Sequence, residues 1–305
     1  MIRSFLPTDL IVILFQRGPL SNVAKTRDNL AEEGVGFLSL AALLMQRLNP
    51  HDRRCTWVCT EGLSFRGLSS ARNRSLSSAW EINHLLLDEQ DVSCCSSLLE
   101  RLTVKGGELG VQRIFLRLPA ESPLLAAAKE VGFAPYMTEY LHFRERREGK
   151  AASDGTSALF SPRRKQAGDD YRLFDLYQKC VPVSIRRVEG MTFKEWQATR
   201  ERGAGTEWVF EKEGSLVGWL GVKAGRHVGQ FEIMAVPEGE WQQIIEYGLM
   251  SLDGCRYLYC LAPEFEAELL RLLEERGFSQ VAKYSALAKE LVIRERQPGL
   301  IPVSA

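Results

Sequence analysis

The stretch SSAWEINHLLLDEQDVSCCSSLLERL, residues 77–102, contains a strand, a turn and the start of a helix. Residues 78–87 form a short, dense apolar run that is typical of a strand. Residues 92–109 are a helix candidate that ends at Gly110, because glycine commonly follows the last turn of a helix. Strands that alternate with helices predict an α/β fold.

The same alternation continues on both sides of this stretch. In the first half we expect strands at 2–5, 56–60, 65–72, 78–87 and 111–118, helices at 36–48, 92–109 and 123–131, and a closing strand region at 133–143. In the second half we expect strands at 207–211, 216–223, 230–236 and 257–261, helices at 241–252 and 263–276, and a closing strand region at 278–291.

The two halves repeat each other. Gly67 precedes Glu81 by 14 residues, and Gly218 precedes Glu232 by the same number. Each half also closes with Gly-Phe after a helix that starts beside a proline. Because the order of elements agrees as well, the repeat predicts two tandem domains, each with a mixed, mostly antiparallel sheet flanked by helices.

A change of composition separates the two domains. Residues 144–170 are rich in charge, Gly, Ser and Ala, as linkers are. We therefore expect a first domain at 1–145, a linker at 146–170, a second domain at 171–292 and a tail at 293–305.

The bulk composition narrows the function classes. The 305 residues include 39 Lys plus Arg and 39 Asp plus Glu, so the formal net charge is zero. A balanced chain gives no electrostatic reason to expect a nucleic-acid or membrane partner. No apolar run is long enough for a transmembrane helix, and the first residues do not match a signal peptide. We expect a cytoplasmic protein.

The seven cysteines favour buried free thiols. Their number is odd, and a chain of this size does not depend on disulfide bonds. Cys55 and Cys59, and the adjacent pair Cys94 and Cys95, do not match the spacing of zinc ligands. We expect no metal site.

The element order resembles the GCN5-related N-acetyltransferase (GNAT) family. The residues that carry the resemblance are the turns Glu61-Gly62 and Glu213-Gly214, the strands 80–88 and 231–236, and the endings Gly132-Phe133 and Gly277-Phe278. The resemblance covers nearly the whole chain outside the linker and the tail. It implies acetyl-CoA, or another acyl-CoA, as the cofactor and a small-molecule or peptide amine as the substrate, with the two domains paired within one chain.

The family holds the pyrophosphate of coenzyme A in a loop before the helix that follows the fourth strand, where backbone N–H groups and the positive helix end face the anion. By resemblance Gln90 fills the first position of this loop, and Ser93 and Cys95 replace its two small residues. Asp91 adds a negative charge there. Two interpretations stay open: a phosphate loop, or a plain helix start capped by Asp91 or Ser93.

The second domain has no such loop. Its turn Pro237-Glu238-Gly239-Glu240 is shorter and acidic, so we expect it not to bind acyl-CoA. In the family a tyrosine four residues before the closing glycine often serves as the acid. That position is Ala128 in the first half and Leu273 in the second, and neither can donate a proton.

The resemblance makes Glu81 the candidate catalytic base, because the family often places a carboxylate on this central strand. The alternative is that Glu81 lies on the solvent face of an alternating strand. The expected function is acyl-CoA-dependent acetyl transfer to an amine by the first domain. The other interpretation is a non-catalytic acyl-CoA-binding or interaction protein that keeps the fold.

Overall fold

A computed structural model of the chain describes residues 1–6, 8, 9, 13, 22–30, 55–62, 64–88, 91–146, 162–201, 205–237 and 239–291. The predicted helix at 36–48 and Gln90 lie outside these residues. No helix within the described ranges is long and apolar enough to cross a membrane.

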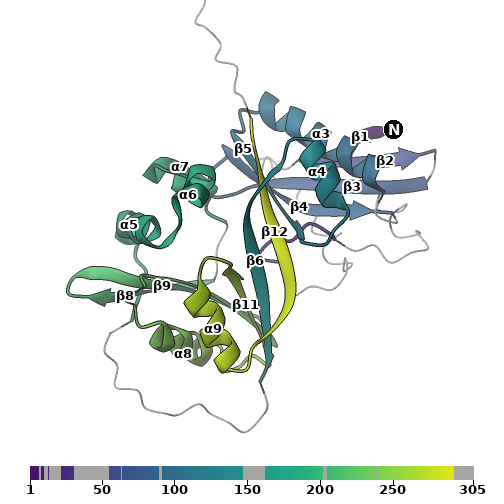
Figure 1. The fold of residues 1–305 in the computed structure, drawn as a ribbon. Helices are drawn as coiled ribbons and strands as arrows, with labels where there is room; N and C mark the ends of the chain where they lie inside the picture. The colour runs from purple at the N-terminus through teal and green to yellow at the C-terminus, as the bar shows by residue number, and fades with distance from the viewer. Residues whose placement is uncertain are drawn as a thin grey trace, which may run out of the picture.

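One continuous mixed sheet of twelve strands forms the centre of the molecule, in the order β1-β2-β3-β4-β5-β12-β6-β11-β10-β9-β8-β7 (Figure 1). The first half supplies β1 Ile2–Ser4, β2 Cys55–Glu61, β3 Ser64–Asn73, β4 Ala79–Leu87, β5 Arg113–Pro119 and β6 Ala134–Glu145, with helices α3 Val92–Glu108 and α4 Leu124–Glu130. The second half supplies β7 Arg163–Arg164, β8 Thr206–Lys212, β9 Ser215–Ala224, β10 Val228–Ala235, β11 Tyr257–Pro263 and β12 Ser279–Glu290, with helices α5 Asp170–Cys180, α6 Val183–Glu189, α7 Phe193–Thr199, α8 Trp241–Ser251 and α9 Ala267–Glu275.

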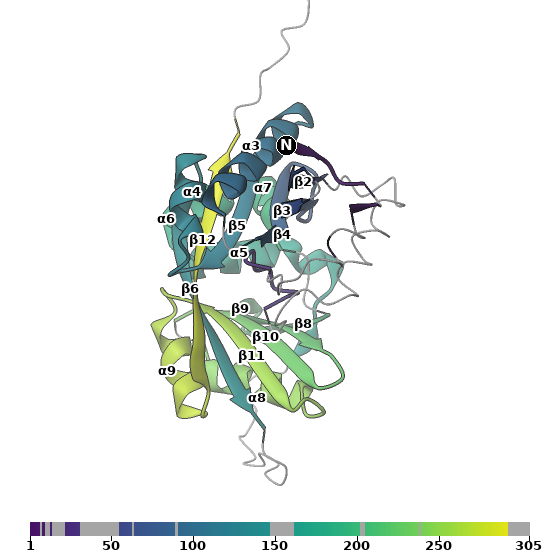
Figure 2. The ribbon, with the colours of Figure 1, turned by 90° about the vertical axis from the view of Figure 1, so that its right-hand side faces the viewer.

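The two halves exchange their last strands. β12 lies between β5 and β6, and β6 lies between β12 and β11 (Figure 2). Leu287 of β12 is buried in the core of the first half, and Phe143 of β6 contacts the rings of Tyr257 and Tyr259 on β11. The expected pairing of the halves within one chain is therefore confirmed, and the exchanged strands bring it about.

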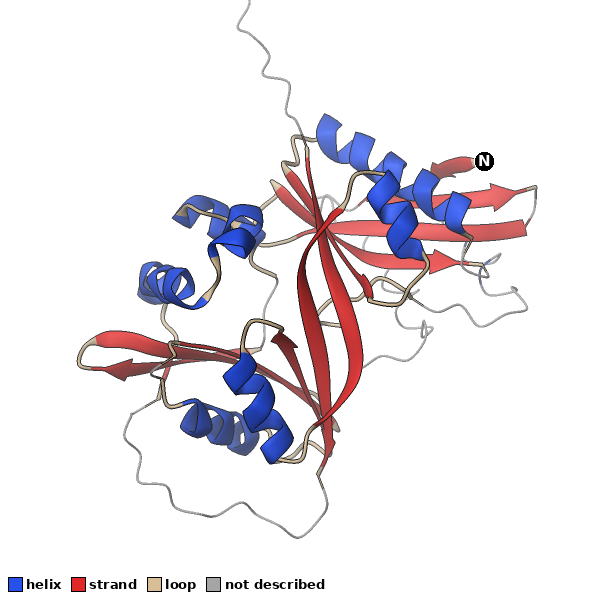
Figure 3. Ribbon diagram, viewed as in Figure 1, coloured by secondary structure: helices blue, strands red, loops and turns tan. Residues whose placement is uncertain are grey.

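Helices cover both faces of the second-half sheet (Figure 3). Phe210 on β8 faces α8 and α9 and contributes to their core, whereas its neighbour Val209 packs on the opposite face with α5 and α7. In the first half α3 and α4 pack on one face over Trp80 and Leu116. This alternation of apolar side chains along each strand makes both sheet faces apolar enough to bury a helix layer.

The glycines of the two Gly-Phe endings have the backbone conformation that the sequence predicts. Gly132 ends α4 with φ +90°, and Gly277 ends α9 with φ +76°. This left-handed conformation is accessible to glycine at little steric cost. The next residues, Phe133 and Phe278, are buried in the two halves of the core.

The repeat is confirmed in strand order but not in the alignment of Glu81 with Glu232. Strand β5 of the first half corresponds to β11 of the second. Glu81 lies opposite Phe115, the third residue of β5, and Gln230 lies opposite Tyr259, the third residue of β11. Gln230 is therefore the counterpart of Glu81. The equal number of residues from Gly67 to Glu81 and from Gly218 to Glu232 is misleading, because the loop before β4 is longer than the loop before β10. Residues at the same place in the two sheets therefore lie at different sequence distances from these glycines.

Candidate functional site

A cavity of about 180 Å³ lies beyond the paired part of β10 and β11 in the second half. The two parallel strands stay paired only from Val228–Tyr257 to Phe231–Cys260, after which they diverge. In open α/β sheets ligands bind beyond the carboxyl ends of parallel strands, where such a divergence leaves a crevice. The cavity is thus at the place where this architecture favours a ligand.

Helices α5, α6 and α7 form one wall of this cavity, and none of them was expected from the sequence patterns. A capping box between Thr192 and Glu195 starts α7, with the Glu195 N–H donating to Thr192 Oγ1 at 3.3 Å. Gly190, at φ +148°, allows the close turn from α6, since an added Cβ would collide with the backbone of Trp196. The pattern Thr-x-x-Glu at 192–195 is the signal that could have revealed this helix.

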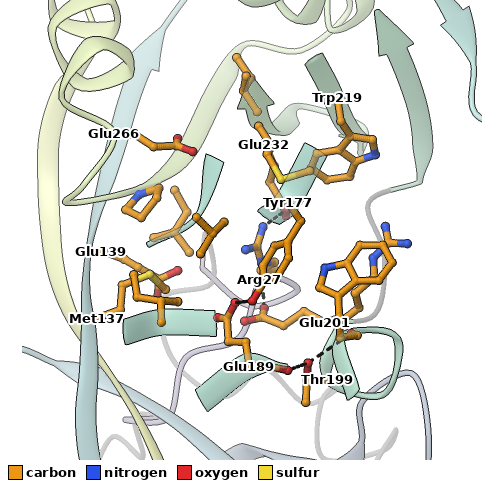
Figure 4. A pocket seen from close by; sticks show the side chains of 18 of the residues that line it. Arg27, Met137, Glu139, Tyr177, Glu189, Thr199, Glu201, Trp219, Glu232 and Glu266 are labelled. Carbon is orange, nitrogen blue, oxygen red and sulfur yellow. Dashed lines mark hydrogen bonds and ion pairs between the residues drawn. The ribbon is translucent and has the colours of Figure 1, made fainter. Parts of the chain in front are cut away.

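The lining is rich in charge. The carboxylates are those of Glu139, Glu189, Glu201, Glu207, Glu232 and Glu266, and the guanidinium groups are those of Arg27, Arg74 and Arg200. The aromatic side chains of Tyr177 and Trp219 lie beside them (Figure 4). Trp196 also lines the cavity. Carboxyl groups thus outnumber guanidinium groups on the cavity surface, and when all of them are ionised this excess favours a cationic ligand.

Four of the six carboxylates pair with arginines, and Arg27 is the partner of Glu232. Arg117 donates to both oxygens of Glu139, at 2.6 and 3.2 Å, and to Glu201 Oε1 at 2.6 Å. Burial alone would raise the pKa of Glu201, but the charges of Arg117, Arg27 and Arg74 outweigh it and hold that pKa well below its usual range. Arg200 donates to Glu207 at 2.7 Å.

Glu189 is partly buried, and its side-chain partners among the described residues are hydroxyl donors rather than cations. Tyr136 Oη donates to its Oε1 at 3.1 Å and Tyr177 Oη to its Oε2 at 3.4 Å. Burial raises the pKa of Glu189, against the nearby charge of Arg74. This network satisfies the carboxylate while binding both tyrosine hydroxyls, so neither hydroxyl is a free proton donor in the cavity.

Glu266 differs from the other carboxylates of the cavity. It precedes α9, and its Oε2 atom is buried without a hydrogen-bond partner among the described residues. Burial raises the pKa of Glu266 to about 8, against the opposing charge of Arg27. A carboxylate with a pKa near neutrality can exchange a proton at physiological pH, which is what general acid–base chemistry requires.

The fold was compared with known proteins. A GCN5-related N-acetyltransferase from Sphaerobacter thermophilus has a TM-score of 0.57 at 14% sequence identity, over 95% of this chain and 95% of that chain. A tandem GNAT protein from the clavulanic acid biosynthesis pathway has a TM-score of 0.50 at 12% identity, over 79% and 84%. No protein-family model and no curated protein matches the sequence.

This chain has a tandem GNAT fold. The predicted fold class and the resemblance to the family's architecture are therefore confirmed. At these identities the likeness is one of fold, and the residues of each half decide what the fold can do.

In the first half of the GNAT fold Glu81 lies in a buried ion-pair network. It is 3% exposed, Arg72 Nε donates to its Oε1 at 2.5 Å, and Arg74 Nε lies 3.8 Å from its Oε2. The alternative that placed Glu81 on a solvent face is thus wrong, because β4 is covered on both faces. The role of Glu81 as a base stays a prediction, and in this geometry the carboxylate is engaged by two arginines.

The helix end predicted for phosphate binding is capped by Asp91. Its Oδ1 accepts from the Cys94 N–H and from Ser93 Oγ, both at 3.0 Å, and Arg66 pairs with its other oxygen at 2.7 Å. Cys95 is fully buried, and burial raises the pKa of its thiol to about 12. Ser93 and Cys95 as coenzyme A contacts stay a prediction that requires Asp91 to leave the helix end.

The gap between β4 and β5 in the first half is filled by the chain itself. These strands are paired from Ala79–Arg113 to Glu81–Phe115 and then diverge, as β10 and β11 do. The segment 22–26 lies between them. Val23 N–H donates to the Leu85 carbonyl at 3.0 Å on one side, and Lys25 N–H donates to the Arg117 carbonyl at 2.9 Å on the other.

The acyl-CoA that the fold implies fits the two halves differently. In the first half a capping carboxylate and residues 22–26 occupy the helix end and the strand gap, so the described conformation does not fit the cofactor. In the second half the Glu240 side chain at the start of α8 makes no capping hydrogen bond to the described residues, and β10 diverges from β11 beside the cavity. Glu240 precedes that helix and opposes an anion there. The expectation that the first half and not the second binds acyl-CoA therefore stays a prediction, and the described conformation of the first half does not favour it.

The two positions at which the family often has an acidic tyrosine are closed to solvent. Ala128 on α4 and Leu273 on α9 are each 0% exposed and lie in the two cores. Neither half therefore has a proton donor at this place.

Proposed function

We propose that the chain transfers an acyl group to a small-molecule primary amine bound in the cavity between β10 and β11. The observation that carries the proposal is Glu266, a partly buried carboxylate that titrates near neutrality in a cavity with an excess of acidic groups. The tandem GNAT fold supports acyl transfer as the reaction class.

Glu266 can act on the amine in two ways. Its ionised form attracts the ammonium form of the ligand, and its buried Oε2 can then accept the proton that an attacking amine must lose. Trp219 and Tyr177 line the same cavity and offer aromatic faces to the cation. The cofactor supplies the activated acyl thioester, while these residues bind and deprotonate the acceptor.

Thiol release from acetyl-CoA with a panel of primary amines tests the proposal. Glu266→Gln keeps the size of the side chain but cannot take the proton, so turnover should fall by about 10²–10⁴, the usual contribution of general acid–base catalysis. Glu268→Gln is the matched control, since Glu268 is exposed at the start of the same helix and pairs with Arg271 on the surface. Equal rates in wild type and Glu266→Gln would remove Glu266 from the reaction.

A second function is favoured by the absence of a proton donor at Ala128 and Leu273. On this account the cavity binds an amine without chemistry. Trp196 and Trp219 line the cavity, so their fluorescence reports binding independently of thiol release. Saturable quenching by an amine with no thiol release above the hydrolytic background would favour the non-catalytic function.

A further inference from the structure

Arg27 reaches the second-half cavity from the first half of the chain. It follows the segment 22–26 that fills the gap between β4 and β5. Its guanidinium pairs with Glu232 on β10 through Nη1 and with Glu201 through Nε at 3.0 Å. Figure 4 shows Arg27 among the carboxylates near the middle of the cavity. A cation built into the chain thus occupies part of an acidic cavity.

The position of Arg27 is fixed from both sides. On its N-terminal side Asn22 accepts from the Leu85 N–H at 2.9 Å and donates to the Asn83 carbonyl at 2.9 Å. On its C-terminal side Asp28 pairs with Arg72 of the first half at 2.8 Å and with Lys223 of the second half at 2.7 Å. These anchors hold the backbone at Arg27 against both halves.

The charges around Arg27 show what it contributes. Glu139 and Glu207 have arginine partners of their own, and Glu201 is also held by Arg117 and Arg74. Among the described residues Arg27 is the one cation that pairs with Glu232. In the described part of the chain no cation contacts Glu266, although the charge of Arg27 opposes the rise in its pKa. Two carboxylates therefore depend on a cation in the cavity, and Arg27 supplies one.

We propose that Arg27 is a specificity-determining residue that fills one of two cation positions in the cavity, so that the site accepts a ligand with one ammonium group and disfavours aliphatic diamines. The inference rests on the proposed function for the location of the amine site. A second ammonium group would meet the guanidinium of Arg27, and like charges at close range repel in a partly buried site. Without Arg27, Glu232 would accept that second charge.

The test is a binding measurement with two ligands of equal chain length, 1-aminobutane and 1,4-diaminobutane, monitored by tryptophan fluorescence and calorimetry. In wild type the monoamine should bind at least as tightly as the diamine. In Arg27→Ala the ratio of dissociation constants should shift toward the diamine by about tenfold, the effect of one modest charge contact. Guanidinium ions at millimolar concentration should reverse the shift by refilling the vacated position.

Two further variants separate the charge of Arg27 from the placement of its segment. Arg27→Lys keeps the charge and should keep the preference of wild type. Asp28→Ala removes both C-terminal anchors but no cavity charge, so it should also keep that preference.

The inference would be overturned if the ratio of dissociation constants shifted equally in Asp28→Ala and Arg27→Ala, or did not shift in folded Arg27→Ala. It would also be overturned if wild type preferred the diamine or bound neither ligand. Thiol release is read separately, so a cavity that shows the predicted ranking without turnover would refute only the proposed catalysis.

Discussion

The gap between β4 and β5 and the gap between β10 and β11 have the same strand arrangement but different contents. In each, two parallel strands pair briefly and then diverge. Residues 22–26 satisfy backbone groups in the first gap, whereas the second opens into a cavity lined by acidic and aromatic side chains. A duplicated fold can therefore close one of its two sites with its own chain and leave the other for a ligand.

The largest expected effect is the loss of folding when the two halves, which exchange β6 and β12, are separated. Because each half lacks the strand that lies between its own last two strands, neither residues 1–146 nor residues 162–305 should fold alone. A chain cut at a protease site inserted between 147 and 161 should stay together as a one-to-one complex. Circular dichroism and gel filtration measure both outcomes. Cooperative unfolding of either isolated half would show that the strand exchange is dispensable.

The next effect is a difference in the free energy of unfolding between substitutions of Glu81 and of its counterpart Gln230. Glu81→Gln removes the buried carboxylate charge that Arg72 and Arg74 share. The free energy of unfolding should therefore fall by about 3–5 kcal/mol, the usual cost of breaking a buried pair. Gln230→Ala, at the matching position, should change it by less than about 0.5 kcal/mol, as most substitutions away from such networks do. Urea denaturation measures both.

The same Glu81→Gln variant tests the sequence-based assignment of the base. On our account its folded fraction releases thiol at the wild-type rate, because the amine site lies in the second half. A loss of turnover by two orders of magnitude or more in folded Glu81→Gln would return the base to the first half.

A smaller effect is expected from the segment that fills the first gap. Asn22→Ala removes the acceptor of the buried Leu85 N–H and the donor to the Asn83 carbonyl. An unsatisfied buried group costs about 1–3 kcal/mol, which should appear as lower stability in urea. If stability is unchanged and acyl-CoA then binds to the first half, the segment is a removable cover rather than part of the fold.

The last effect is a pH dependence located in the second gap. Burial raises the pKa of Glu266 from 4.5 to about 8, so between these values the native protein keeps a proton that the unfolded chain has lost. The contribution of Glu266 therefore makes the free energy of unfolding fall as pH rises from about 4.5 to about 8. Glu266→Gln should reduce the slope of the free energy of unfolding against pH. Part of the slope should remain, because the pKa of the Glu189 carboxyl is also raised. Identical slopes in wild type and Glu266→Gln would contradict the shift.

The sequence predicted the fold better than the site. Strand and helix order follow from local patterns, and α3 and β4 are found within one residue of their expected bounds. The exchange of β6 and β12 could not be read from such patterns, because either strand could pair with either half. The solvent-face alternative for Glu81 was wrong because the burial of Glu81 and its pairing with Arg72 depend on β3, which the strand pattern around Glu81 does not include.

The cavity was missed for a related reason. Its residues come from segments as far apart as Arg27, Tyr177 and Glu266, and no short motif contains them. The acidic turn before α8 predicted only that an anionic ligand would be repelled. The carboxylates that line the cavity favour a cationic ligand instead. The raised pKa of Glu266 arises from burial, which local sequence does not reveal.

Amide hydrogen exchange with and without acetyl-CoA and a primary amine tests most directly whether the second half holds the site. The account predicts slower exchange at residues 232–237 and 261–266, which border the cavity, and unchanged exchange at residues 82–87 and 116–119, which already pack against the segment 22–26. Slower exchange confined to 82–87, 92–96 and 116–119 would place the ligand in the first half and contradict the account.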